Sequence, residues 1–271
     1  MTIVNKAIIP CGGKGTRMAA LTGGGAKELM PIANRPLLEW VLAECAASGV
    51  DNVLVVASPH KADVIEVARA AAGRARMPSR IETIIQHEPR GLADAIRLGR
   101  EFADGDAFGV ALPDNLFLAD VPALAQLIET YRSTRKNIVA MVELFPADAE
   151  RAGPTSIYPG RLNGDEYIID EVPSKGSRGS TFDLKGMPSG FTGVGRYVLL
   201  PEVFRAIDEI DKTLSPGAEL DDVPVMGLLL ARGRLTGRRI VGEFLDVGLP
   251  VGYREANERL STFDQHPRLA R

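Results

Sequence analysis

The stretch AIIPCGGKGTRM, residues 7–18, joins a short apolar run directly to a turn with three glycines and two cations. A glycine-rich turn after a strand can bring several backbone N–H groups around one anion, because glycine permits close approach and positive φ. Phosphate is the natural ligand of such a turn. We therefore interpret residues 7–10 as the end of a strand and residues 11–18 as a candidate phosphate turn.

Outward from this turn, strand and helix patterns alternate. Apolar runs at residues 53–57, 81–86 and 108–113 are separated by helical patterns near 36–48, 62–72 and 92–102. Such alternation is typical of a parallel sheet covered on both faces, which binds ligands beyond the carboxyl ends of its strands. We predict an α/β fold with a mostly parallel mixed sheet and helices on both of its faces.

The second half is less regular. We predict a helix near 121–134, strands at 138–144, 166–172 and 193–200, helices at 201–209 and 223–231, a strand at 238–247 and a last helix at 251–260. Gly and Pro interrupt residues 152–196, which favours a smaller mixed β lobe. No linker composition divides the chain, so we predict a single domain over residues 1–271.

Composition excludes several classes of protein. The 271 residues are 45% apolar and 25% charged, which is ordinary for a globular protein. A net charge of -3 leaves no basic excess for nucleic acid, and no run of about eighteen apolar residues could cross a membrane. We expect a cytoplasmic protein with neither nucleic acid nor membrane as a partner, in which Cys11 and Cys45 are packing residues.

Two familiar phosphate loops do not fit the spacing of the turn. A Walker loop needs glycine at the position of Ile8, and a dinucleotide fingerprint needs a third glycine at the position of Met18. A plain strand-to-helix turn, with Lys14 and Arg17 solvated, remains an alternative when the turn is taken alone.

Four segments together resemble the sugar-nucleotide pyrophosphorylases, the UTP- and dTTP-dependent glucose-1-phosphate nucleotidyltransferases. They are PCGGKGTRM (10–18) with KELMP (27–31), QHEPRGLADAI (86–96), FGVALPDNLF (108–117) and EFLDVGLPVGY (243–253). Each segment is moderately specific, and the four in this order are strongly specific. The resemblance implies a Rossmann-like fold whose nucleotide-binding half is about residues 1–135 and whose sugar-binding and C-terminal half is about 136–271.

The resemblance also implies roles for individual residues. Arg17 and Lys27 become the catalytic cations, and Asp114 and Asp246 become ligands of Mg²⁺. Contacts to the nucleotide are implied for Gly12, Gly13, Gly15, Thr16, Glu28, Gln86 and Gly91, of which Gln86 and Gly91 read the base. Gly153 and Glu171 become contacts to the sugar. A homo-oligomer, dimer or tetramer, is also implied.

Elementary chemistry agrees with these roles. A sugar 1-phosphate already carries an anionic oxygen near pH 7, so its attack on a nucleoside triphosphate needs no general base. The obstacle is the repulsion between two polyanions, which positioning and charge neutralisation can overcome. Arginine offers phosphate a planar fork, lysine a movable charge, and Mg²⁺ needs only a few protein oxygens.

One position departs from the family. Where its members usually carry Glu-Lys-Pro, this chain has Glu171-Val172-Pro173, and valine cannot neutralise a phosphate. Our hypothesis is that a cation from the following loop replaces the missing lysine; the candidates are Lys175, Arg178 and Lys185.

The sequence therefore favours a magnesium-dependent nucleotidyltransferase that joins a nucleoside triphosphate, UTP first and dTTP second, to a sugar 1-phosphate, glucose 1-phosphate by default. Three alternatives stay open for the reaction: a catalytically silent sugar-nucleotide-binding paralogue, a metal-dependent glycosyltransferase, and a nucleotidyltransferase for a cyclitol or deoxysugar phosphate. ATP, GTP or CTP in place of UTP or dTTP also stays open.

Overall fold

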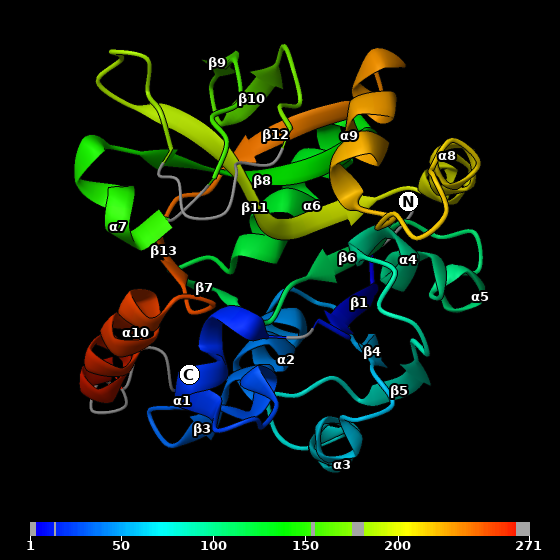
Figure 1. Ribbon diagram of the computed structural model, residues 1–271, viewed down its shortest axis with the longest axis vertical. Coiled ribbons are helices and arrows are strands. Elements are labelled where there is room, and N and C mark those ends of the chain that lie inside the picture. The colour runs from blue at the N-terminus through cyan, green and yellow to red at the C-terminus, as the bar shows by residue number, and fades with distance from the viewer. Residues whose placement is uncertain (1–3, 14, 153–154, 175–181, 264–271) are drawn as a thin grey trace.

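A computed structural model describes residues 4–13, 15–152, 155–174 and 182–263. Its centre is a nine-stranded sheet in the order β5-β4-β1-β6-β11-β8-β12-β10-β9 (Figure 1). Among the described helices, none is both long and apolar enough to span a membrane.

The first half of the chain forms the parallel part of this sheet. β1 (Lys6–Cys11) lies between β4 (Asn52–Ala57) and β6 (Phe108–Ala111), and β5 (Arg80–Ile85) pairs with β4. All four strands run in the same direction, so their carboxyl ends meet at one edge. The predicted parallel arrangement is confirmed, and the turn after Cys11 lies at that edge.

The second half continues the same sheet. β11 (Gly190–Leu199) pairs antiparallel with both β6 and β8 (Asn137–Leu144), and β12 (Leu235–Arg239) pairs parallel with β8. The antiparallel strands β10 (Glu166–Ile169) and β9 (Gly160–Asn163) complete the far end. The predicted mixed β region is thus the end of one large sheet (Figure 1).

Helices cover both faces, as predicted. One face carries α2 (Leu37–Ala47), α3 (Ala62–Ala71) and α6 (Ala123–Thr134). The other carries α4 (Leu92–Arg97), α5 (Arg100–Ala103), α8 (Glu202–Asp211) and α9 (Asp222–Ala231).

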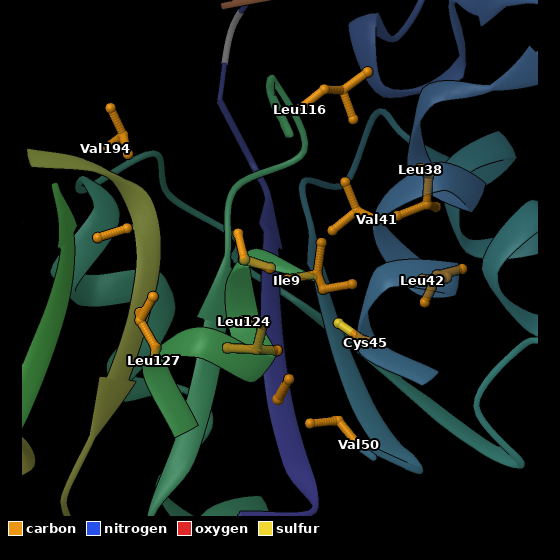
Figure 2. Packing of buried hydrophobic residues seen from close by; sticks show 14 of the residues in the cluster. Ile9, Leu38, Val41, Leu42, Cys45, Val50, Leu116, Leu124, Leu127 and Val194 are labelled. Atoms are coloured by element: carbon orange, nitrogen blue, oxygen red, sulfur yellow. The ribbon is translucent and has the colours of Figure 1, made fainter. Parts of the chain in front are cut away.

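Successive residues of β1 explain these two layers. Ala7 and Ile9 belong to the first core and Ile8 to the second, because successive side chains of a strand point to opposite faces. Figure 2 shows Ile9 packed among Val41 of α2 and Leu124 of α6.

Short elements connect these layers. β7 (Asn115–Leu118) and β13 (Glu243–Asp246) form an antiparallel ribbon, and β2 (Pro31–Ile32) pairs with β3 (Arg35–Pro36). The C-terminal helix α10 (Pro250–Phe263) packs beside β13 and β2. The remaining elements are η1 (Thr16–Met18), α1 (Ala19–Thr22), η2 (Lys27–Leu29), η3 (Pro146–Asp148) and α7 (Ala149–Ala152).

Two glycines divide elements that the sequence predicted as continuous. The predicted strand 238–247 is wrong as one unit: Gly242, at φ +149°, separates β12 from β13. The predicted helix 92–102 is interrupted at Gly99, where a Cβ would clash with Ile8. In both cases close packing of the backbone overrides local propensity. The strand predicted at 166–172 ends earlier, at Ile169.

Candidate active site

The glycine turn lies where the sequence predicted, directly beyond β1. Gly12 and Gly13 follow Cys11, Gly15 has φ +63°, and Thr16 begins the short helix η1. The backbone N–H of Met18 donates to the carbonyl of Gly15 (3.0 Å), which closes the turn. The positive φ of Gly15 and this hydrogen bond are compatible with the predicted anion-binding loop, whose Lys14 lies outside the described residues.

Lys61 holds this turn through hydrogen bonds, although the sequence analysis did not identify it as a site residue. Its Nζ donates to the carbonyl oxygens of Cys11 (2.7 Å) and Gly13 (2.8 Å) and to both carboxylate oxygens of Glu28 (3.0 and 2.8 Å). Glu28 is fully buried. The only available signal was that Lys61 follows β4, the strand next to β1.

Glu28 thus has a different setting from the one expected. Its carboxylate lies under the turn and is occupied by Lys61. A direct contact between Glu28 and a nucleotide stays a prediction, and the observed contacts give this residue a bracing role.

Lys27 and Asp114 come together at the edge of the sheet. The Lys27 Nζ donates to Asp114 Oδ2, and the lysine stem passes 3.7 Å from the position that a Cβ on Gly15 would take. Burial alone would raise the pKa of Asp114, but Lys27, together with a smaller contribution from Arg17, more than offsets this and holds the pKa below its usual value. Burial opposes the charge of Lys27 too, yet Asp114 raises the lysine pKa. Both groups are therefore charged at neutral pH.

Asp246 joins the same site from the ribbon of β7 and β13. It pairs in register with Asn115, the residue after Asp114. A methyl group on Gly248 would lie 3.0 Å from Asp246 Oδ1 and 3.1 Å from Asp114 Oδ2, so both carboxylates border one small space. Burial and the charge of Asp114 raise the pKa of Asp246 to about 7.

The two carboxylates fit a hard divalent cation. Asp246 is poorly ionised while it faces Asp114, and a cation would favour its charged form. The described residues contain no cluster of three or more His, Cys, Asp or Glu side chains with metal-binding geometry. Mg²⁺ suits such a sparse set, because it commonly keeps several waters and takes phosphate oxygens as ligands.

Arg17 lies in η1 with an exposed side chain. Its charge lowers the pKa of both Asp114 and Asp246, so the guanidinium is close enough to act on this site. No ion pair between Arg17 and another described residue occupies it, which leaves its fork available to a ligand.

A second missed residue, Arg196, fixes the loop that carries Asp114. The guanidinium is completely buried and makes a paired contact with Glu44 (3.0 and 2.7 Å). It also donates to the carbonyl oxygens of Leu112 (2.8 Å) and Asn115 (2.7 Å), on either side of Asp114. A single arginine inside the apolar stretch GVGRYVLL was the available signal.

Gln86 and Gly91 lie close to each other, and Gln86 lies beside Gly12 of the turn. Gln86 is buried, and its Nε2 donates to Asp94 Oδ2 (2.9 Å) and to the Gly91 carbonyl (3.2 Å). Gly91 has φ +117°, and a Cβ there would lie 2.5 Å from the carbonyl oxygen of Leu220. Glycine is therefore required at this position on two counts.

The sugar side of the expected site is only partly described. Gly153, Lys175 and Arg178 lie outside the described residues. Glu171 is exposed just beyond β10, and Lys185 is exposed as well. Val172 is half-buried and packs against the apolar core, as a valine would and a charged lysine would not.

Comparisons with known proteins point in one direction. The protein family described as nucleotidyl transferase matches residues 6–262. A Bacillus subtilis (strain 168) protein named "Putative UTP–glucose-1-phosphate uridylyltransferase" is 30% identical over 93% of this chain and 94% of its own length.

Two further comparisons cover nearly the whole chain. A UTP–glucose-1-phosphate uridylyltransferase of Staphylococcus epidermidis (strain RP62A) is 26% identical over 93% of this chain and 91% of its own length. The crystal structure of a UDP-glucose pyrophosphorylase complexed with UDP-glucose superposes with a TM-score of 0.79 at 22% identity, covering 96% of this chain and 99% of that one. This last likeness establishes the fold.

Proposed function

We propose the following reaction for this chain, which belongs to the nucleotidyl transferase family: it transfers a nucleotidyl group from a nucleoside triphosphate to a sugar 1-phosphate, with release of pyrophosphate. The observation that carries the proposal is the meeting of Lys27, Asp114 and Asp246 beside the glycine turn, at the carboxyl edge of the parallel strands.

The reaction needs charge control more than proton transfer. An oxygen of the sugar 1-phosphate bonds to the α-phosphorus, and the bond from that phosphorus to the β-phosphate oxygen breaks. In our proposal the turn of Gly12, Gly13, Gly15 and Thr16 holds the triphosphate through its backbone N–H groups. Arg17 and Lys27 neutralise the charge that moves onto the pyrophosphate.

Asp114 and Asp246 are the proposed holders of Mg²⁺. When bound there, the cation would neutralise phosphate charge and help to orient the oxygens. Before it arrives, Lys27 balances Asp114. The ion pair lets Lys27 turn toward phosphate once the carboxylate has another cation as its partner.

For the nucleotide we propose UTP first and dTTP second. The curated relatives carry names of UTP-dependent enzymes, and Gln86 with Gly91 lies where a base could be read. Residues 1–135 would bind the nucleotide and residues 136–271 the acceptor. The two pyrimidine bases differ by one methyl group, which changes binding by only about 1–3 kcal/mol.

Glucose 1-phosphate is the proposed acceptor, with Gly153 and Glu171 at the sugar. Val172 removes one expected cation from that side, so a cyclitol or deoxysugar phosphate is the second candidate. Lys175 is the first candidate for a replacement cation. A cytoplasmic location and a dimer or tetramer remain predictions.

The test is a screen of UTP, dTTP, ATP, GTP and CTP against a panel of sugar 1-phosphates, read out as pyrophosphate. We expect release only when Mg²⁺, UTP or dTTP, and an acceptor are all present. Nucleotide binding without pyrophosphate would instead favour the silent paralogue. A glycosyltransferase would also give no pyrophosphate, but it would release nucleoside diphosphate when supplied with a nucleoside diphosphate sugar and an acceptor.

A further inference from the structure

The side chain of Asp94 has no part in the phosphate chemistry, yet it is buried beside the turn. It projects from the first turn of α4, immediately after Gly91, and is 6% exposed. Its Oδ2 accepts from Gln86 Nε2 at 2.9 Å. Burying a carboxylate costs free energy unless hydrogen bonds or charged partners compensate it, so we ask what this contact does.

The surroundings of Gln86 decide which way its amide faces. The Gly91 carbonyl and Asp94 Oδ2 are both acceptors, and an ionised carboxylate has no proton to donate. The NH₂ group must therefore face these two oxygens. If the amide were turned over, Gln86 Oε1 would instead oppose two acceptors.

The oxygen of this amide is consequently directed at the turn. Gln86 Oε1 lies so close to Gly12 that any Cβ at residue 12 would clash with it. Within the described part of the chain, no group donates a hydrogen bond to Oε1. Because residue 12 is glycine, Gln86 Oε1 can lie against the turn as a fixed hydrogen-bond acceptor, on the side where a base would bind.

Asp94 is itself held in place by a network. Its Oδ1 accepts from Arg97 Nη2 at 2.5 Å. Arg97 and Arg90 both contact Asp211 at the end of α8 (2.7 and 2.5 Å). The carboxylate therefore cannot rotate freely away from Gln86.

We propose that Asp94 is a positioning residue that locks the Gln86 amide with its oxygen toward the base. This inference rests on the proposed function. A fixed acceptor selects bases with a ring N–H on the edge they present, which are uracil, thymine and guanine. Cytosine and adenine present an unprotonated ring nitrogen there, so this nitrogen and Gln86 Oε1 would be two hydrogen-bond acceptors facing each other.

Asp94→Asn offers a sharp test, because it changes the donor pattern at almost constant size. Its oxygen will stay toward the donors of Arg97, which leaves its NH₂ facing Gln86. This NH₂ opposes that of Gln86, and only the Gly91 carbonyl still holds the original orientation, so the turned-over amide, with its NH₂ toward the base, should become populated. Asp94→Ala removes the lock without adding an opposing donor and leaves the Gly91 carbonyl to hold the amide.

The measurement is the ratio of kcat/KM for UTP to that for CTP, from pyrophosphate release. We expect the wild-type ratio to be about 100 or more and Asp94→Asn to lower it at least about tenfold, with a smaller loss in Asp94→Ala. An unchanged ratio in Asp94→Asn would overturn the proposal. Asp211→Asn is the matched control: it cuts the same network away from Gln86 and should change the ratio by less than about twofold.

Two further measurements test the proposal if the enzyme releases no pyrophosphate or if the variant does not fold. Calorimetric affinities for UTP and CTP give the same ratio without turnover, so an absence of pyrophosphate would count against the proposed function alone. If Asp94→Asn does not fold, nitrogen-15 NMR of the wild type decides, with the Gln86 side-chain signal assigned by its loss in Gln86→Leu. Slow exchange of its NH₂ protons with solvent is expected, and free exchange would contradict the lock.

Discussion

At the scale of single residues, Asp114 is the side chain at which the charged groups of the site meet. It is paired with Lys27, borders Asp246, and is fixed from behind by the contacts of Arg196 with Leu112 and Asn115. The site therefore contains a balanced pair, Lys27 with Asp114, and a second carboxylate, Asp246, whose pKa is raised. Such an arrangement is ready to accept a cation and a polyanion together.

Replacing single charges tests this view. Arg17→Ala and Asp114→Asn should each lower kcat by about a hundredfold or more, because both act on charge that develops during transfer. The Arg17 side chain is exposed, so its loss should leave thermal stability nearly unchanged. Steady-state pyrophosphate release measures the effect, and near-normal turnover in both variants would argue against the mechanism.

Asp246 predicts a pH dependence of stability. Its carboxyl has a pKa of about 7 in the folded chain because of burial and the charge of Asp114, against 3.8 for an ordinary aspartate. Between these two values the folded protein keeps a proton that the unfolded chain has released, so folding stability falls as pH rises through this window and levels off above it.

The comparison variant is Asp246→Asn, which cannot titrate. In metal-free buffer, the wild type should lose a few kcal/mol more than Asp246→Asn between pH 5 and pH 7.5, measured by urea unfolding. Equal slopes for the two proteins would refute the assignment. Added Mg²⁺ should flatten the wild-type slope, because a bound cation favours the ionised carboxylate.

At the scale of elements, Lys61 ties three segments together. It reaches from the residues before α3 to the turn after β1 and to Glu28 in η2, the short helix that also carries Lys27. The turn and the helix that carries Lys27 are thus held by one buried ion pair. Damage to this pair should affect both.

The prediction uses a single and a double variant. Lys61→Met should destabilise the fold by about 3–5 kcal/mol, because it leaves the buried Glu28 carboxylate without a partner. Lys61→Met combined with Glu28→Gln should recover most of this stability and still show a raised KM for the nucleotide. Urea unfolding and initial rates give the two readouts. A double variant with wild-type KM would show that the pair only stabilises the fold.

The elements also show what the sequence could foretell. Alternating apolar runs and helical patterns predicted the parallel strands, and the parallel order places the turn and Asp114 at one edge. Lys61 and Arg196 were missed because their partners lie far along the chain, and a lysine after a strand or an arginine in an apolar stretch does not reveal those partners. The break at Gly242 was missed because it depends on contact with Ala119, which only the folded chain creates.

At the scale of the whole molecule, one continuous sheet presents both halves of the chain to the same edge. The antiparallel pairing of β6 with β11 joins the parallel strands to the mixed part (Figure 1). We propose that the triphosphate and the acceptor approach from these two sides. The acceptor side differs more from the resembled family, because Val172 stands where its members usually carry a lysine.

That division predicts where a replacement cation acts. Alanine in place of Lys175, Arg178 or Lys185, one at a time, should raise the KM for the sugar phosphate in one case and leave the KM for the nucleotide unchanged. Initial rates at varied acceptor concentration measure this. If all three variants match the wild type, the hypothesis of a loop cation fails.

The most direct test of the central claim is a crystal structure of the chain with UTP and Mg²⁺ bound. The account predicts the triphosphate on the backbone N–H groups of the turn after β1, with the cation between its oxygens and the carboxylates of Asp114 and Asp246. A triphosphate bound away from that turn, or a cation that touches neither carboxylate, would contradict it.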